Sequence, residues 1–173
     1  GNLVSKFPNA KIIVNDVEWY EMRNPNNRTR GTYLKENWEP IQDQVTTFSD
    51  SIDIIPEIQM IHTSGHSNGH CIILLKQGED TMIHMGDLML THVHRNPLWV
   101  PAVDDYPMKS ISAKDKWLRQ AFENGYKFFF YHDQFFAVAE FDKEGKEFVN
   151  YVLRSRPPVI PFTEQQDRRP DFL

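Results

Sequence analysis

The stretch from Thr63 to His70 reads TSGHSNGH and carries two histidines, His66 and His70, four residues apart. Gly65 and Gly69 stand directly before them, and nothing in the stretch favours a helix. Glycine lets the backbone pass close to an ion or a neighbouring group, because it has no Cβ atom to clash. Since imidazole is a common metal ligand, we expect at least one of these histidines to hold a metal ion.

Apolar runs on both sides predict that this stretch is a loop between two strands. Residues 58–61 precede it and residues 71–75 follow it, and both runs are short and rich in β-branched or long apolar side chains. A third run over 81–85 comes after the sequence QGED at 77–80, which is typical of a hairpin turn. The histidines therefore belong to the connections of a sheet.

Two further candidate ligands also follow predicted strands. Asp87 comes directly after Gly86 at the end of the third run, and His132 ends the aromatic run 128–131, which we interpret as a buried core strand. Loops at strand ends bring distant residues to one place. Imidazole and carboxylate suit zinc, iron or manganese, and a small number of protein ligands leaves an open, catalytic position. Each residue alone is more typical of a hydrogen-bonded histidine or a turn aspartate, so the prediction depends on the combination.

Helix signals flank these strands. Asn15 with Glu18 three residues later is typical of a helix N-cap. A second helix is predicted from a cap at Ser112, with Trp117 on its apolar face and Gly125 at its end.

We expect one α/β domain over residues 1–153, followed by an extended, proline-rich tail over 154–173. Residues 135–141 and 147–153 predict a closing hairpin. The long irregular stretch over 88–109 is typical of a functional loop.

Composition narrows the possible partners. Hydrophobic residues make up 40% and charged residues 25% of the 173 residues, and no apolar run approaches the roughly 20 residues that span a bilayer. The net charge of -5 and the scattered lysines and arginines argue against a nucleic-acid partner. The single cysteine, Cys71, and an N-terminus without a signal-peptide pattern favour the cytoplasm. We therefore expect a cytoplasmic protein that binds neither nucleic acid nor a membrane.

In order and spacing, these residues resemble the metallo-β-lactamase-fold hydrolases. The matching features are T-x-G-H-x-x-G-H at 63–70, Gly86-Asp87 and the strand-terminal His132. More narrowly, the chain resembles the YtnP-type branch of quorum-quenching N-acyl-homoserine lactonases, and the resemblance covers nearly all of residues 1–153. The segments that carry it are GDLM at 86–89 with Thr91, NPLW at 96–99, DYP at 105–107 and YHD at 131–133.

One family motif, H-x-H-x-D-H, is absent from this sequence. In the family, a glycine and then elements similar to residues 1–14 follow that motif. The resemblance therefore implies an αββα sandwich of which this chain is the C-terminal half. It also implies a partner, the missing N-terminal half, which would supply the other sheet and further metal ligands.

The resemblance implies a role for each candidate. His70 would complete a first metal site, Asp87 would bridge two ions and His132 would belong to the second site. His66 is interpreted as a residue that shapes the loop, with ligation as the alternative. The ions would be divalent, zinc first, with iron or manganese as alternatives. A hydroxide held between them would open a lactone ring, and the aspartate of the absent motif would protonate the leaving oxygen. Tyr106 would donate a hydrogen bond to the carbonyl oxygen or pack beside it.

Other histidines and aromatic residues receive less specific interpretations. His92 and His94 have ligand-like spacing but follow the Gly-Asp pair, so we interpret them as pocket lining or surface. His62 and His84 lie within strands and are predicted to be structural. Trp99 is a candidate contact for an acyl chain.

The predicted function is a metal-dependent hydrolase that opens the lactone ring of N-acyl-homoserine lactones, with a small lactone or ester as substrate. A phosphotriesterase or thioesterase on the same fold is an alternative, because fold and ligands do not fix the substrate. A second alternative is an inactive fragment or metal-free binding module that pairs through an exposed sheet edge. A homodimer is also possible in either case.

Overall fold

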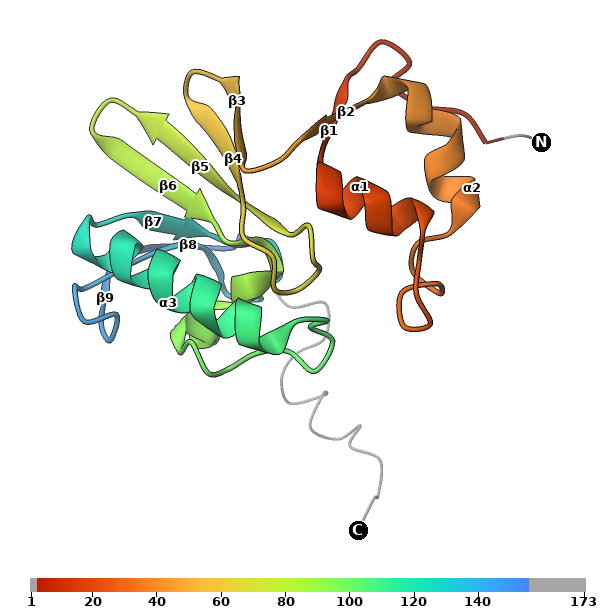
Figure 1. Ribbon diagram of the computed structural model, residues 1–173. Helices are drawn as coiled ribbons and strands as arrows, with labels where there is room; N and C mark the ends of the chain where they lie inside the picture. The colour runs from red at the N-terminus through yellow and green to blue at the C-terminus, as the bar shows by residue number, and fades with distance from the viewer. Residues whose placement is uncertain (1–2, 156–173) are drawn as a thin grey trace.

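The computed structural model describes residues 3–155, which form a mixed α/β structure with two sheets. One sheet is a parallel pair, β1 and β2, and the other has seven strands in the order β3-β4-β5-β6-β7-β8-β9 (Figure 1). The strands are β1 (Ile12–Asn15), β2 (Val45–Phe48), β3 (Ser51–Ile55), β4 (Ile58–His62), β5 (Cys71–Gln77), β6 (Asp80–His84), β7 (Lys127–Phe129), β8 (Phe136–Phe141) and β9 (Phe148–Leu153). The predicted tail lies outside the described residues from position 156 onward.

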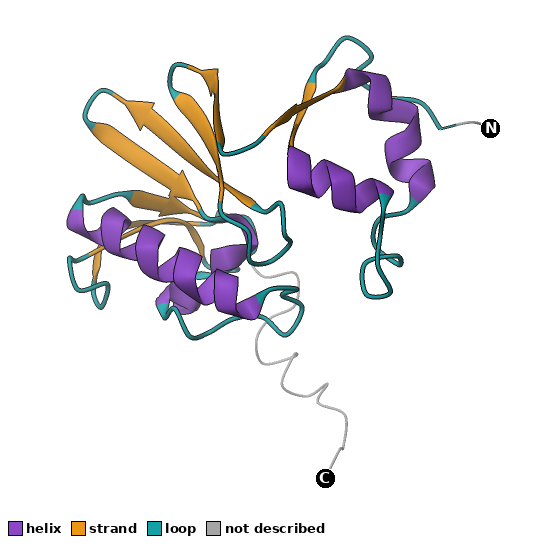
Figure 2. Cartoon of the chain, viewed as in Figure 1, coloured by secondary structure: helices purple, strands orange, loops and turns teal. Residues whose placement is uncertain are grey.

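The N-terminal part is a small unit beside the large sheet (Figure 2). It consists of the parallel pair with the helices α1 (Asp16–Arg23), α2 (Lys35–Trp38) and the 3-10 helix η1 (Glu39–Gln44). The predicted cap at Asn15 is confirmed, because its side-chain oxygen accepts from the backbone N–H of Val17. Its amide group donates to the backbone oxygens of Phe48 and Ser49, so the cap also fixes α1 to the end of β2.

The large sheet confirms the predicted strands around the histidine stretch. β4 pairs antiparallel with β5, and His62 lies opposite Cys71, so residues 63–70 form the loop between them. β5 and β6 form the next hairpin. β6 pairs parallel with β7, and such a pair needs a crossover connection. That crossover contains the 3-10 helices η2 (Gly86–Met89) and η3 (His92–Arg95) and the helix α3 (Pro107–Glu123).

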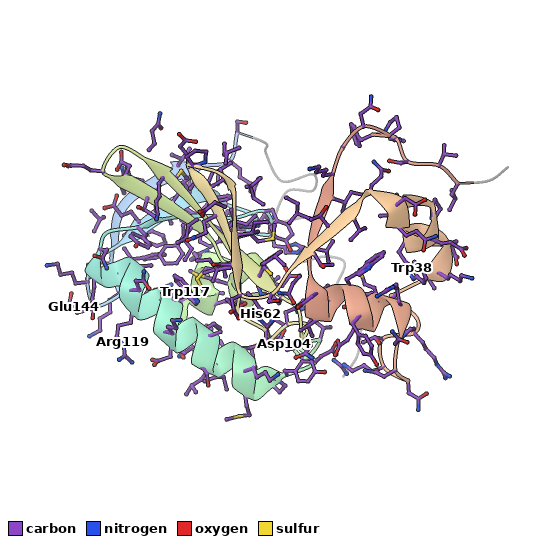
Figure 3. All side chains as sticks on the ribbon, turned by 45° about the horizontal axis from the view of Figure 1, so that its top comes forward. Trp38, His62, Asp104, Trp117, Arg119 and Glu144 are labelled. Atoms are coloured by element: carbon purple, nitrogen blue, oxygen red, sulfur yellow. The ribbon has the colours of Figure 1, made fainter. Side chains whose placement is uncertain are left out.

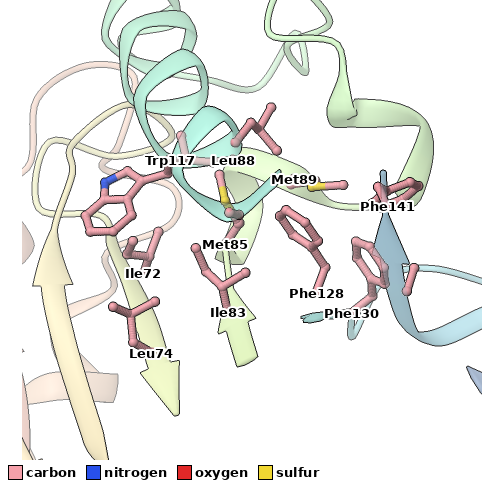
Figure 4. Close-up of a cluster of buried hydrophobic side chains, with 13 residues drawn as sticks. Ile72, Leu74, Ile83, Met85, Leu88, Met89, Trp117, Phe128, Phe130 and Phe141 are labelled. Atoms are coloured by element: carbon pink, nitrogen blue, oxygen red, sulfur yellow. The ribbon is translucent and has the colours of Figure 1, made fainter. Parts of the chain in front are cut away.

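The hydrophobic core lies between α3 and one face of the large sheet (Figure 4). Trp117 from the helix is buried, as its spacing predicts, and it packs with Ile72 of β5 and Leu88 of η2 in one cluster. This pairing of one sheet with one helix corresponds to two neighbouring layers of the predicted sandwich. No helix among residues 3–155 is both long and apolar enough to cross a membrane.

Helix α3 begins six residues earlier than predicted. Pro107 is its first residue and Tyr106 its N-cap, whereas Ser112 lies inside the helix and donates from its hydroxyl to the oxygen of Met108. The fixed φ angle of proline and its missing N–H suit the first helical position, and this signal outweighs the serine. The predicted end is confirmed, because Gly125 adopts a φ of +64° just past the helix.

The aromatic run 128–131 is only partly core. Phe128 and Phe130 are buried, as predicted, but Tyr131 is 52% exposed. Strand β7 ends at Phe129, so the chain has left the sheet before Tyr131. The prediction of a buried Tyr131 is therefore wrong, and the side chain takes part in the site described next.

Candidate metal centre

Three predicted histidines meet around a fourth predicted residue, Asp87. Oδ2 of Asp87 lies 3.2 Å from Nε2 of His66, and Oδ1 lies 3.3 Å from Nε2 of His132. The backbone N–H of Asp87 donates to Nε2 of His70 across 3.2 Å. Residues 66, 70, 87 and 132 come from three separate connections of the sheet, and the fold brings them together as the sequence predicts.

Asp87 owes its position to the glycine before it. Gly86 adopts a φ of +53°, which L side chains rarely adopt, and it turns the chain from β6 into η2. A Cβ atom on Gly86 would lie 2.5 Å from Nε2 of His70, so glycine also allows the close approach of these two segments. Tyr131 donates a hydrogen bond from its hydroxyl to Oδ1 of Asp87.

Both ring nitrogens of His70 are in contact with other groups. Its Nδ1 lies 2.9 Å from the hydroxyl oxygen of Thr63, and its Nε2 accepts the N–H of Asp87. Burial, together with the nearby imidazole of His66, lowers the pKa of His70 from 6.5 to about 4. The ring is therefore neutral near pH 7. Since Nε2 accepts, Nδ1 carries the proton and donates to Thr63, which fixes the tautomer.

His66 lies between two carboxylates. Its Nδ1 is 3.0 Å from Oδ1 of Asp104, and its Nε2 faces Asp87. Asp104 lies at the N-terminal end of α3 (Figure 3), and its other oxygen accepts from the hydroxyl of Ser110 at 2.6 Å. Each contact between the imidazole and a carboxylate requires a proton or a cation between nitrogen and oxygen. Asp104 thus fixes the ring through Nδ1, and Nε2 faces the carboxylate of Asp87.

Sequence reasoning missed two residues of this cluster. Asp104 stands next to the DYP segment at 105–107 but carried no signal of its own, because a lone loop aspartate is common. Tyr131 was interpreted as core, although its place directly before a candidate ligand was the available signal.

The remaining candidates lie elsewhere. Tyr106 donates from its hydroxyl to Glu21 on α1, so its role at a substrate carbonyl stays a prediction. His92 and His94 lie on the 3-10 helix η3, where their Nδ1 atoms contact Asp133 at 2.6 Å and Thr91 at 2.9 Å.

His62 and His84 contact backbone oxygens within or next to the sheet, as structural residues would. Trp99 is exposed, and its contact with an acyl chain also stays a prediction.

The donor chemistry fits a divalent ion in part. The cluster offers imidazoles and a carboxylate with one histidine at each oxygen. Zinc, iron and manganese accept such ligands. However, no group of three or more histidine, cysteine, aspartate or glutamate side chains within residues 3–155 is arranged to hold an ion. Burial raises the pKa of the Cys71 thiol to about 12, so this thiol is protonated near pH 7.

A cavity of about 560 Å³ opens beside His66. Its wall includes the polar side chains of Glu18, Tyr33, Arg28 and Asp105, but most of the lining surface is apolar. Its size is typical of pockets that bind small molecules.

The fold is similar to solved structures of hydrolases. A protein from Staphylococcus aureus, described as a probable metal-dependent hydrolase, matches at 36% identity with a TM-score of 0.80, over 84% of this chain and 53% of its own. The hydrolase AbOPH of the β-lactamase superfamily matches at 22% identity with a TM-score of 0.71, over 91% of this chain and 60% of its own. AidC, a dizinc quorum-quenching lactonase, matches at 17% identity with a TM-score of 0.65, over 90% of this chain and 60% of its own.

This chain therefore spans between about half and three fifths of the length of these three proteins. No protein-family model matches the chain, and no curated protein matches it. The similarity at 36% identity extends over most of this chain, and the more distant matches agree on the fold. Over the part that it spans, the chain thus has the metallo-β-lactamase-type fold, and its structural neighbours are hydrolases of that fold.

Proposed function

We propose that this chain supplies His70, Asp87 and His132 to the two-ion metal centre of a hydrolase that opens N-acyl-homoserine lactones. The observation that carries the proposal is the position of Asp87, whose two carboxylate oxygens face two different histidines. A carboxylate held in this way is suited to bridge two ions. The remaining ligands would come from an H-x-H-x-D-H motif on a segment that this sequence does not contain.

Divalent ions at this centre, zinc first with iron or manganese as alternatives, would supply Lewis acidity and a nucleophilic water. His70 is already neutral, so its Nε2 lone pair is available without loss of a proton. Ion binding there would replace the hydrogen bond from the N–H of Asp87. His66, fixed by Asp104, would hold the carboxylate of Asp87 in orientation rather than act as the main ligand.

The substrate is proposed to be a small lactone or ester. The cavity beside His66 has the volume for such a molecule, and its wall combines a mostly apolar surface with polar side chains such as Arg28 and Tyr33. The choice of a lactone is supported by AidC, a dizinc quorum-quenching lactonase that shares the fold at 17% identity.

Metal content and turnover of the purified chain test this proposal. We expect zinc uptake, measured by competition with a chromophoric chelator, to be lost in Asp87→Ala and His132→Ala. Adding the segment with the H-x-H-x-D-H motif should then produce ring opening of N-hexanoyl-homoserine lactone, followed by proton release. Thioester and phosphotriester substrates in the same assay measure the alternatives on this fold. Equal zinc uptake by the wild type and Asp87→Ala would contradict the ligand assignment.

A second candidate is a metal-free binding module. It is favoured by the finding that the described residues do not form a complete three-ligand group. In that case the wild type would take up no zinc, and strand β9, whose residues from Val149 to Leu153 are largely exposed, would be a pairing edge. A homodimer and a cytoplasmic location remain predictions that mass determination in solution and cell fractionation would test.

A further inference from the structure

Helix α1 lies directly against the histidine loop. The backbone of Gly69 approaches the first turn of α1 so closely that a Cβ atom on Gly69 would lie 2.3 Å from the N and Cβ atoms of Glu18. Any side chain at position 69 would therefore push the helix and the loop apart. Position 69 immediately precedes His70, so this contact lies beside a proposed ligand.

Both oxygens of the Glu18 carboxylate are used in this contact region. Oε2 accepts from the hydroxyl of Ser67 at 2.7 Å and from the backbone N–H of Gly69 at 3.2 Å. Oε1 accepts from the hydroxyl of Tyr33 at 2.5 Å. In the predicted capping pattern, the side chain of Glu18 would turn back toward Asn15. In the structure it accepts instead from Ser67 and Gly69, which lie 49 and 51 positions away in the sequence.

The other side of the loop is held by backbone groups. The N–H of Asp105 donates to the oxygen of His66, and the N–H of Tyr106 donates to the oxygen of Gly65, both at 3.0 Å. On the α1 side, Glu21 also accepts a hydrogen bond from the side-chain amide of Asn68 at 3.0 Å. The segment between the two histidines is thus held between α1 and the start of α3. Hydrogen bonds to a carboxylate are stronger than those between neutral groups, so Glu18 contributes a large share of this restraint.

We infer that Glu18 is a positioning residue that fixes His66 and His70 through Ser67 and Gly69. Its effect on ion binding rests on the proposed function, whereas its effect on the loop does not. Removing the carboxylate would free residues 67–69 while the strand pairs on either side of the loop stay in place. The imidazoles would then lose part of the orientation that makes them ready to bind an ion.

The test is Glu18→Gln, which keeps the size of the side chain but removes its charge and one acceptor oxygen. We expect zinc affinity to fall about 10- to 100-fold, as for other groups that orient metal ligands. We also expect faster hydrogen exchange of the Gly69 amide, measured by NMR without metal. The matched control is Glu36→Gln, an exposed glutamate on α2, which should change neither quantity.

A second variant approaches the same contact from the loop. Gly69→Ala should lower zinc affinity in the same direction, whereas Gly31→Ala, with nothing within 4 Å of the added Cβ, should not. If Glu18→Gln does not fold, Ser67→Ala removes one of the hydrogen bonds with a smaller perturbation and is judged by the same two readouts.

The outcomes separate the two ideas. A wild type that binds no zinc overturns the proposed function, and the exchange rate of Gly69 then decides the role of Glu18 alone. Unchanged exchange at Gly69 in Glu18→Gln, or zinc affinity within about twofold of a zinc-binding wild type, would overturn the positioning role.

Discussion

The two histidines among the proposed ligands, His70 and His132, are held in different ways. His70 is enclosed, with Thr63 at one ring nitrogen and the backbone N–H of Asp87 at the other. The side chain of His132 is 50% exposed, and its ring contacts Tyr131 and one oxygen of Asp87. The His70 side of the site is thus set by partly buried hydrogen bonds, whereas the His132 side is open to solvent.

This difference indicates which part of the site the chain organises by itself. The contacts that hold His70 also hold the fold together, because Gly86 and the loop between β4 and β5 both lie against its ring. Changes there should therefore affect stability and metal binding together. Changes on the His132 side should affect metal binding with little effect on stability.

Gly86→Ala should have the largest effect. The added Cβ would lie 2.5 Å from Nε2 of His70, and a φ of +53° disfavours alanine, so we expect a loss of about 3 kcal/mol in the free energy of unfolding. The control is Gly78→Ala, which has a similar φ of +61° but open space, and should cost about 1 kcal/mol. Urea unfolding measures both. Equal losses for the two variants would mean that His70 is not tightly enclosed.

The stability of the protein should depend on pH through Lys114. This buried side chain donates to the backbone oxygens of Asn96 and Trp99, in the loop that leads to Asp104. Burial lowers the pKa of Lys114 from 10.5 to about 8. Between these two values the unfolded chain binds more protons than the folded one, so stability due to Lys114 rises with pH over that window.

The variant Lys114→Met measures this effect. Relative to the variant, the wild type should gain on the order of 3 kcal/mol of unfolding free energy between about pH 8 and 10.5. Lys116→Met, at an exposed position of the same helix, should run parallel to the wild type. A constant difference between wild type and Lys114→Met across this range would show that the pKa of Lys114 is not lowered.

A pair of alanine variants compares the two sides directly. His70→Ala removes the ring that contacts the hydroxyl of Thr63 and leaves the N–H of Asp87 without its partner, which should cost about 1 to 3 kcal/mol. His132→Ala removes a half-exposed ring and should stay within about 0.5 kcal/mol of the wild type. Thermal and urea unfolding test both values. If His132→Ala proves the more destabilising, the distinction between an enclosed and an open side is wrong.

Sequence patterns predicted the local features of this structure well. Apolar runs located the strands on both sides of the histidine loop, and Gly86-Asp87 followed its strand as expected. These features depend on neighbours in the chain, so a local pattern contains the information.

Contacts between distant segments could not be predicted in the same way. The place of Asp104 beside His66 joins residues 38 positions apart, and nothing local distinguishes it from an ordinary loop aspartate. The start of α3 was predicted too late because Ser112 is a residue type typical of an N-cap, whereas the helix begins at Pro107. Tyr131 was assigned to the core because an aromatic run does not reveal where its strand ends.

The most direct test of the site is the location of zinc in crystals of the zinc-loaded protein, measured by anomalous diffraction at the zinc edge. We predict a peak about 2.0 to 2.2 Å from both Nε2 of His70 and a carboxylate oxygen of Asp87. Zinc bound elsewhere, with neither of these atoms within ligand distance, would contradict the account.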